Sequence, residues 1–345
     1  MGIMQMLMSG GAAGPIDPRE HFGVKTWTGN GSTQSITGLG FSPDFLWIKC
    51  RNTAYDHRVF DTIRGYDERL GPNISDGAYA DTSLTSFDPD GFSLSSSTTT
   101  NGSGKTQVAW AWNAGGSTVT NNDGNSTANV RANPAAGFSI VQFTVPSGDD
   151  LKSYGHGLGA EPSLIITKRT DSSGSWTSFT DVTGSNQYLT LNGVNGINSA
   201  GVQFAKSDST FSLFNSHYTD AGWDMIAYCF ASVEGYSKFG KYTGTYPSGG
   251  HSVTCGFEPT FLMIKRLDNG TTGSTYGGWM MMDNARTGTN DQLFANCASA
   301  EGSRGNCSST ADLRGSVSFT STGFDVSGGY YETNDAVDYL YAAFA

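Results

Sequence analysis

One pattern of apolar and polar positions occurs three times along the chain. A glycine is followed three residues later by a proline, then by a run of large apolar residues that leads to a lysine. The copies span residues 40–49, 159–168 and 256–265. A short apolar run that begins just after a proline and is bounded by turn residues is typical of a buried β-strand. The pattern therefore predicts three equivalent buried strands.

Other elements recur around these strands in the same order. An aromatic strand precedes each copy, at residues 22–27, 138–143 and 236–242, and a closing strand with small residues between aromatic ones follows at 108–112, 226–231 and 340–345. A penultimate strand is similar at 90–94 and 322–326, with a weaker counterpart at 209–213. Recurrence in a fixed order indicates a repeated unit. The predicted repeats are residues 22–115, 138–232 and 236–345.

Strands that alternate apolar and polar residues, separated by Gly and Asn clusters, are typical of half-buried antiparallel sheets. We therefore expect an all-β protein with three tandem antiparallel β-sandwich (jelly-roll-like) repeats. Residues 116–137, rich in Asn, Ser, Thr and Gly, are predicted to be an exposed linker. Only a few residues, 232–235, join the second and third repeats, which favours a rigid pair.

Residues 1–21 lie outside the repeats. They are predicted to form a short N-terminal docking arm, with a disordered terminus as the alternative. The candidate docking residues are Met4, Met6, Leu7 and Met8. No basic residue precedes this apolar run, which is also too short to cross a bilayer, so we expect neither a secretory signal nor membrane insertion.

The composition and charge of the chain limit the kinds of partner that it can bind. The 46 Gly, 20 Phe, 15 Tyr and 7 Trp fit many short strands joined by turns, and enough apolar residues are present for the chain to fold. A formal net charge of −11 with scattered Lys and Arg argues against a nucleic-acid partner, because phosphate binding needs clustered basic residues. The five cysteines show no metal-binding spacing; Cys297 and Cys307 lie in one polar loop and either pair or stay free.

No catalytic signature is complete. Residues 104–106 end like a phosphate-binding loop, but Thr99 stands where the first glycine is required. Glu161 and Glu258 occupy one repeat position, which favours a structural role over a glycosidase pair. The turn at Asp88 and Asp90 suits either a calcium ion or an ordinary Asp-Gly turn. We expect no catalytic, metal-binding or cofactor-binding residues, no cofactor and no enzyme activity.

Aromatic side chains in loops are the remaining binding candidates. Trp and Tyr faces stack on sugar rings when they are exposed, whereas most such residues pack in a core. The candidates are Trp176, Tyr330 and Tyr331.

Several short motifs in residues 22–115 resemble, as a set, a domain that recurs in virion structural proteins of marine tailed bacteriophages, cyanophages among them. They are residues 27–31, 40–49, 57–61, 86–92 and 108–112. The later repeats carry the same motifs in degraded form. The resemblance implies a virion component such as a tail, tail-fibre or surface protein, and it carries no catalytic residues over to this chain.

These observations lead to three hypotheses. The first is a non-enzymatic phage structural protein, assembled in the host cytoplasm and located in the virion. Its arm would bind other virion proteins, and its repeats would project as a homo-oligomer, predicted to be a trimer. The second is a carbohydrate-binding, lectin-like module for host surface polysaccharide. The third is a polysaccharide-degrading enzyme, which requires two carboxyl groups that converge in a groove.

Overall fold

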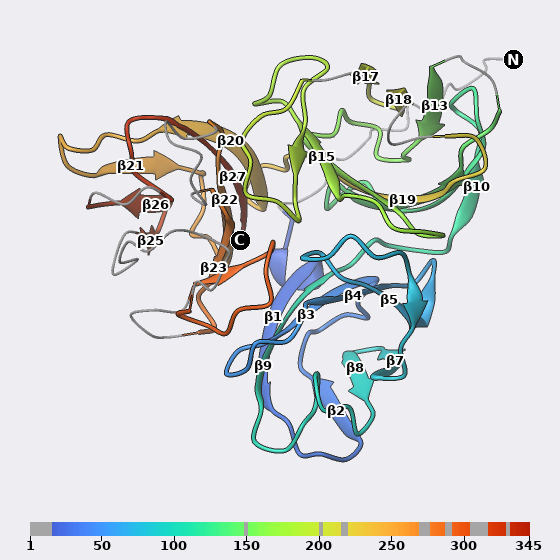
Figure 1. Cartoon of the computed structure of the whole chain (residues 1–345), viewed down its shortest axis with the longest axis horizontal. Coiled ribbons are helices and arrows are strands. Elements are labelled where there is room, and N and C mark those ends of the chain that lie inside the picture. The colour runs from blue at the N-terminus through green and yellow to red at the C-terminus, as the bar shows by residue number, and fades with distance from the viewer. Residues whose placement is uncertain are drawn as a thin grey trace, which may run out of the picture.

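The computed structural model describes residues 16–147, 151–199, 203–214, 220–268, 277–286, 292–303, 317–328 and 332–345. Within them the protein is all-β, with one short 3-10 helix, η1 (Pro18–Glu20), and no α-helix. The strands in these ranges form six sheets, three large and three small, and their ladders are antiparallel. Figure 1 shows the sheets gathered into three lobes around a common centre.

The three large sheets share an order in which a first strand pairs with a closing strand, and the closing strand pairs with a central strand. The first large sheet has the order β1 (Phe22–Thr28), β9 (Thr106–Trp112), β3 (Phe45–Cys50), β4 (Arg58–Asp61), β5 (Gly65–Leu70), β6 (Tyr79–Ala80). The second has the order β10 (Val119–Asn121), β11 (Ala128–Asn133), β12 (Phe138–Thr144), β19 (Asp224–Phe230), β14 (Leu164–Arg169), β15 (Thr177–Thr180), β16 (Leu189–Thr190). The third has the order β20 (Ser237–Thr243), β27 (Asp338–Phe344), β22 (Phe261–Arg266), β23 (Trp279–Asp283), β24 (Leu293–Phe294).

Each large sheet is accompanied by a small one of three strands. The first small sheet is β2 (Gln34–Thr37), β8 (Gly91–Leu94), β7 (Leu84–Asp88). The second is β13 (Lys152–Gly155), β18 (Thr210–Phe214), β17 (Gln203–Lys206), and the third is β21 (His251–Thr254), β26 (Gly323–Val326), β25 (Val317–Thr320). We refer to each large sheet with its small partner as the first, second and third sheet pair.

The recurring apolar runs form the central strands β3, β14 and β22, so the prediction of three buried strands is confirmed. These strands are covered on both faces, which explains why their sequences do not alternate. In β3, Leu46 and Ile48 pack in the core shared with the first small sheet. Phe45 and Trp47 point the other way, into a core common to all three large sheets.

This common core is rich in aromatic residues, and it joins parts of the chain that are far apart in sequence. The ring of Phe45 lies 4.5 Å from that of Tyr228, between the first and second sheet pairs. The ring of Phe22 lies 5.3 Å from that of Phe344, between the first and third. Because three further clusters lie within the individual sheet pairs, every large sheet separates a private core from the shared one.

Ring side chains at equivalent register positions link the sheet pairs. They are His57, Trp176 and Trp279. Each stands four residues before the residue that pairs with the first residue of a central strand, namely Asp61, Thr180 and Asp283, respectively. Each makes a buried or partly buried hydrogen bond to a backbone carbonyl of another sheet pair. In the same order, the carbonyls belong to Phe294 at 3.0 Å, Gly71 at 2.9 Å and Thr190 at 2.9 Å.

Lysines that follow the central apolar runs make a second set of links. The ammonium groups of Lys49, Lys168 and Lys265 are buried. They donate to the carbonyls of Ala298 at 3.0 Å, Ser75 at 3.1 Å and Val194 at 3.0 Å, respectively.

Backbone bonds complete the pattern two residues after each lysine. Glu301 N–H donates to Arg51 C=O, Ala78 N–H to Thr170 C=O and Ile197 N–H to Leu267 C=O. The second sheet pair is thereby joined to the first, the third to the second and the first to the third. We call this closed ring of contacts the interlock.

Two fully buried ion pairs lie beside the interlock. Asp61 pairs with Arg64 at 2.7 Å and accepts a hydrogen bond from the Tyr228 hydroxyl at 2.8 Å. Asp283 pairs with Arg286 at 2.7 Å and accepts from the Trp110 indole at 2.9 Å. The aspartates occupy equivalent register positions, and each accepts from a neighbouring sheet pair.

Residues 116–137 differ from the predicted exposed linker, because they contain β10 and β11 and extend the second large sheet. Ala128 and Val130 pack in the second private core, whereas Asn129 and Arg131 lie on the opposite face. The alternation is short and its apolar members are small, so the surrounding Asn, Ser and Thr conceal it in the sequence.

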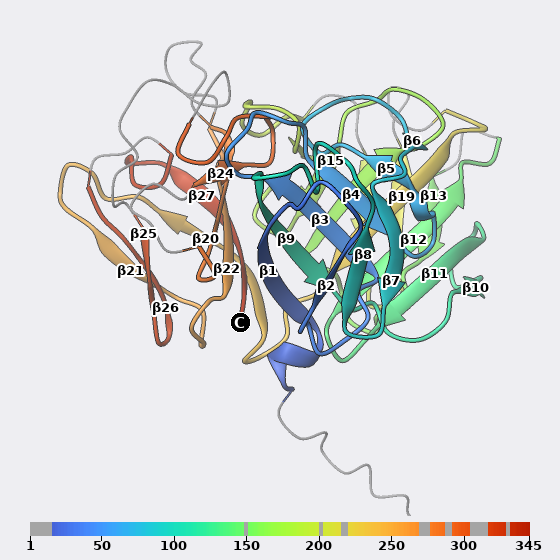
Figure 2. The same ribbon diagram turned by 90° about the horizontal axis from the view of Figure 1, so that it is seen from below.

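The predicted docking residues Met4, Met6, Leu7 and Met8 lie outside the described residues. The end of the predicted arm is held against the body: the His21 ring lies 6.0 Å from the Tyr236 ring. Helix η1 lies at one end of the molecule (Figure 2). It borders an open hollow that Ala345 also lines.

The cysteines behave in two ways. Cys50, Cys229 and Cys255 are free and buried, as expected of small apolar residues; Cys50 and Cys229 lie in β3 and β19, and Cys255 directly follows β21. Cys297 is disulfide-bonded, and its suggested partner Cys307 lies outside the described residues.

Replacing Asp61 by Asn is expected to destabilise the protein by about 3–5 kcal/mol, because Arg64 then stays buried without a counter-charge. Urea unfolding measures the change. Asp338→Asn is the matched control: its pair with Lys241 is largely exposed, with side chains 40% and 47% accessible, and its loss should cost under about 1 kcal/mol. Equal losses in the two variants would contradict this account.

Burial lowers the pKa of Lys49 and Lys168 to about 8 and that of Lys265 to about 7. Above these values the unfolded chain binds more protons than the folded one, so the free energy of unfolding should rise from about pH 7.5 to about pH 9.5. The slope should fall in Lys265→Met by up to about 1.4 kcal/mol per pH unit. Urea titrations across this range test the sign; an unchanged slope in the variant would refute it.

Candidate functional site

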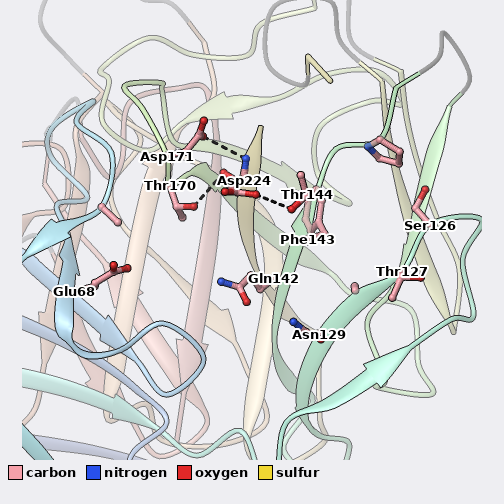
Figure 3. Close-up of a pocket in the computed structure, with 13 residues that line it drawn as sticks. Glu68, Ser126, Thr127, Asn129, Gln142, Phe143, Thr144, Thr170, Asp171 and Asp224 are labelled. Carbon is pink, nitrogen blue, oxygen red and sulfur yellow. Dashed lines mark hydrogen bonds between the residues drawn. The ribbon is translucent and has the colours of Figure 1, made fainter. Parts of the chain in front are cut away.

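An open hollow of about 740 Å³ lies between the first and second sheet pairs (Figure 3). Most of the side chains around it are polar. Its lining residues are Glu68, Ala78, Ser126, Thr127, Ala128, Asn129, Gln142, Phe143, Thr144, Pro146, Thr170, Asp171 and Asp224. The volume falls within the range of about 300–1,000 Å³ that is usual for small-molecule sites.

One wall of the hollow is a face of the second large sheet. Asn129 lies opposite Gln142 across β11 and β12, and Thr144 lies opposite Asp224 across β12 and β19. Ile140 precedes Gln142 on the same face and packs in the common core. The same face of the sheet is therefore apolar where it packs in the common core and polar where it lines the hollow.

The other wall comes from the first sheet pair. Glu68 lies on the exposed part of β5, and Ala78 precedes β6. Ala78 N–H donates to Thr170 C=O at 2.7 Å, which is one of the interlock bonds. The hollow thus lies directly beside the interlock, and its two walls are held at a fixed separation there.

A set of hydrogen bonds holds the rim. The Thr144 hydroxyl donates to the Asp224 carboxylate at 2.6 Å, and Thr170 N–H donates to the Asp224 carbonyl at 2.8 Å. The Asp171 carboxylate accepts from Arg169 at 2.8 Å. This bond lowers the pKa of Asp171, so the carboxyl group is ionised at neutral pH.

Arg169 is held on two sides. Its guanidinium group pairs with Asp171 and lies 4.0 Å from the centre of the Trp223 ring. A cation that is both paired and stacked is poorly placed to attract an anion into the hollow.

Three side chains that line the hollow have no hydrogen-bond partner within the described part of the chain. They are Glu68, Asn129 and Gln142. All three reach solvent, so they are hydrated when the hollow is empty. Together they offer carboxylate and amide oxygens as acceptors and amide N–H groups as donors, which suits a polar ligand.

Trp176, predicted as a stacking residue for sugars, is buried in the structure, with 1% of its surface accessible. Its indole is a donor of the interlock, and its ring stacks 6.3 Å from that of Tyr228. Trp176 is therefore a core residue and not a sugar platform. Tyr330 and Tyr331 lie outside the described residues.

The other polar motifs have structural partners. Asp90 accepts hydrogen bonds from the backbone N–H groups of Gly38 and Gly40, and Asp88 accepts from Ser86 and Ser93. Across the described residues, no group of three or more His, Cys, Asp or Glu side chains is placed to hold a metal ion. In the same part of the chain, no helix combines the length and apolar character needed to cross a membrane.

Sequence reasoning missed the hollow. The signal was the change along one face of residues 138–144, where Phe138 and Ile140 are followed by Gln142 and Thr144. Such a change indicates a strand that emerges from a core, but it does not reveal which part of the chain forms the opposite wall.

The fold and the hollow together define an all-β protein whose sheet pairs close into a ring around one shared core. The chain belongs to a family described as a domain of unknown function, DUF7483, whose sequence model matches residues 17–345. A comparison with curated proteins finds no significant match.

The unpartnered groups of the hollow contribute little to folding. Glu68→Gln and Gln142→Ala are each expected to change the free energy of unfolding by less than about 0.5 kcal/mol, because both side chains are solvated and unbonded. Urea unfolding checks this. A loss above about 1.5 kcal/mol would mean that these residues serve the fold and are not available to a ligand.

Proposed function

We propose that this chain is a non-enzymatic structural protein of a bacteriophage virion, a tail, fibre or surface component. The observation that carries the proposal is the interlock, which joins three sheet pairs into one body through buried bonds. Local unfolding begins in regions that have few buried contacts. The interlock covers the ends of the central strands, so these ends are not such regions. Such a body suits a particle component, and the motifs in residues 22–115 that resemble a virion domain support the same assignment.

The proposal includes the architecture predicted from the repeats. The three sheet pairs would be tandem copies of one sandwich-type, jelly-roll-like unit. Their shared strand order and the equivalent positions of His57, Trp176 and Trp279 support this view. Residues 1–21 would form the docking arm for other virion proteins, and the predicted homotrimer would form through surfaces outside the interlock.

Cryo-electron microscopy of purified particles tests the assignment, with the chain located in the density. The proposal expects it on an outer appendage or on the capsid surface. A chain without residues 1–15 should fold but fail to enter particles, whereas the full-length chain enters them. Absence of the full-length chain from particles would contradict the proposal.

A free carbohydrate-binding module is the second candidate. The polar hollow favours it, because hydroxyl, amide and carboxylate groups converge there without a buried catalytic pair. This candidate expects binding to polysaccharide by a protein that is absent from particles, which separates it from the first.

A further inference from the structure

The hollow lies where the correspondence between the sheet pairs breaks down. The second large sheet carries β10 and β11 beyond its first strand, β12, and the other large sheets show no such extension within the described ranges. Ser126, Thr127, Ala128 and Asn129, at the turn into β11 and on its first residues, line the hollow. The added hairpin thus builds part of a site that the common architecture does not require.

The charged and polar groups around the hollow exclude two classes of ligand. Glu68 and Asp224 present carboxylates that have no basic partner in the described part of the chain, while Arg169 at the rim is already paired. Desolvating an anion beside these carboxylates is unfavourable, so acidic ligands are excluded. An apolar ligand would leave the amides of Asn129 and Gln142 without partners, which is equally unfavourable.

The arrangement of donors and acceptors narrows the class further. Adjacent amides on β11 and β12 each donate and accept, and the carboxylates only accept. A ligand that matches them must donate hydrogen bonds to the carboxylates, both donate to and accept from the amides, and carry no negative charge. Sugar hydroxyl groups have this property.

An exposed aromatic ring lies in β5, the strand that carries Glu68. Tyr66 is 47% accessible and stands two residues before Glu68, in a stretch where the pairing of β5 with β4 is irregular. The Tyr66 ring is not part of the lining of the hollow, but it is an exposed aromatic surface near Glu68 in the chain, whereas Trp176 is buried.

We propose that the hollow binds a neutral oligosaccharide segment, held by hydrogen bonds to Glu68, Asn129 and Gln142. This inference rests on the proposed function in one respect only: the segment would belong to the surface polysaccharide that a virion protein meets. The same chemistry would also recognise a free neutral oligosaccharide.

The test uses the full chain on an array of neutral, amino and carboxylated oligosaccharides, followed by calorimetric titration of the neutral ones. Glu68→Gln and Gln142→Ala are expected to weaken binding at least tenfold. Glu258→Gln and Gln203→Ala are the matched controls, because both residues are exposed and neither lines the hollow. Thermal unfolding of all four variants confirms that they are folded.

Loss of binding in the first two variants alone supports the inference. Binding that all four variants retain would place the ligand elsewhere and overturn it, as would binding restricted to amino or carboxylated sugars. No binding by the folded full chain would also overturn it, while detection of the chain in particles would leave the virion assignment intact. Conversely, neutral-sugar binding by a chain absent from particles would support the site and remove the virion role.

Discussion

The structure depends on carrying hydrogen-bond donors across an apolar interior to backbone carbonyls of a neighbouring sheet pair. A loop carbonyl that is buried at such a junction needs a partner, because an unpaired polar group inside a protein costs about 1–3 kcal/mol. Lysine meets this need with a long apolar stem and several N–H groups. Lys49 donates both to Cys50 in its own sheet pair and to Ala298 in the third. The same device at Lys168 and Lys265 closes the ring, so no sheet pair is joined on one side only.

The junctions vary in a coordinated way. Where Asp61 and Asp283 supply buried acceptors, a tyrosine and a tryptophan from the neighbouring sheet pair supply the donors. At the junction between the second and third sheet pairs, Thr180 stands at the position of the aspartates, and Ala342 stands at the position of the tyrosine and tryptophan donors. A buried carboxylate without its partners is strongly unfavourable, so donor and acceptor must change together. Both ring nitrogens of His57 also have partners. Trp47 donates to Nδ1, so Nε2 carries the proton and donates to the Phe294 carbonyl in the third sheet pair. Burial lowers the pKa of His57 well below its usual value and keeps the ring neutral.

Local sequence patterns predicted the all-β class and the central strands, because a strand buried on both faces appears as a continuous apolar run within about six adjacent residues. They did not predict how the sheet pairs close, because the contact between Lys49 and Ala298 joins residues that share no local pattern. The burial of Trp176 is hidden in the sequence for the same reason: its hydrogen-bond partner, Gly71, lies in another sheet pair. Residues 116–137 resemble a linker in sequence, because their small apolar residues among Asn and Thr give only a weak alternation. The hollow needs both kinds of information, a strand that turns polar and a distant wall that faces it.

The interlock and the hollow are linked, since the bond between Ala78 and Thr170 belongs to one and borders the other. A site between two sheet pairs keeps its shape only if the pairs do not move independently. Differential scanning calorimetry measures this directly by comparing the calorimetric enthalpy of unfolding with the van't Hoff enthalpy. A closed ring predicts one transition in which the two enthalpies are equal. Two or three separate transitions, or a calorimetric enthalpy well above the van't Hoff value, would show that the sheet pairs unfold independently and would contradict the account.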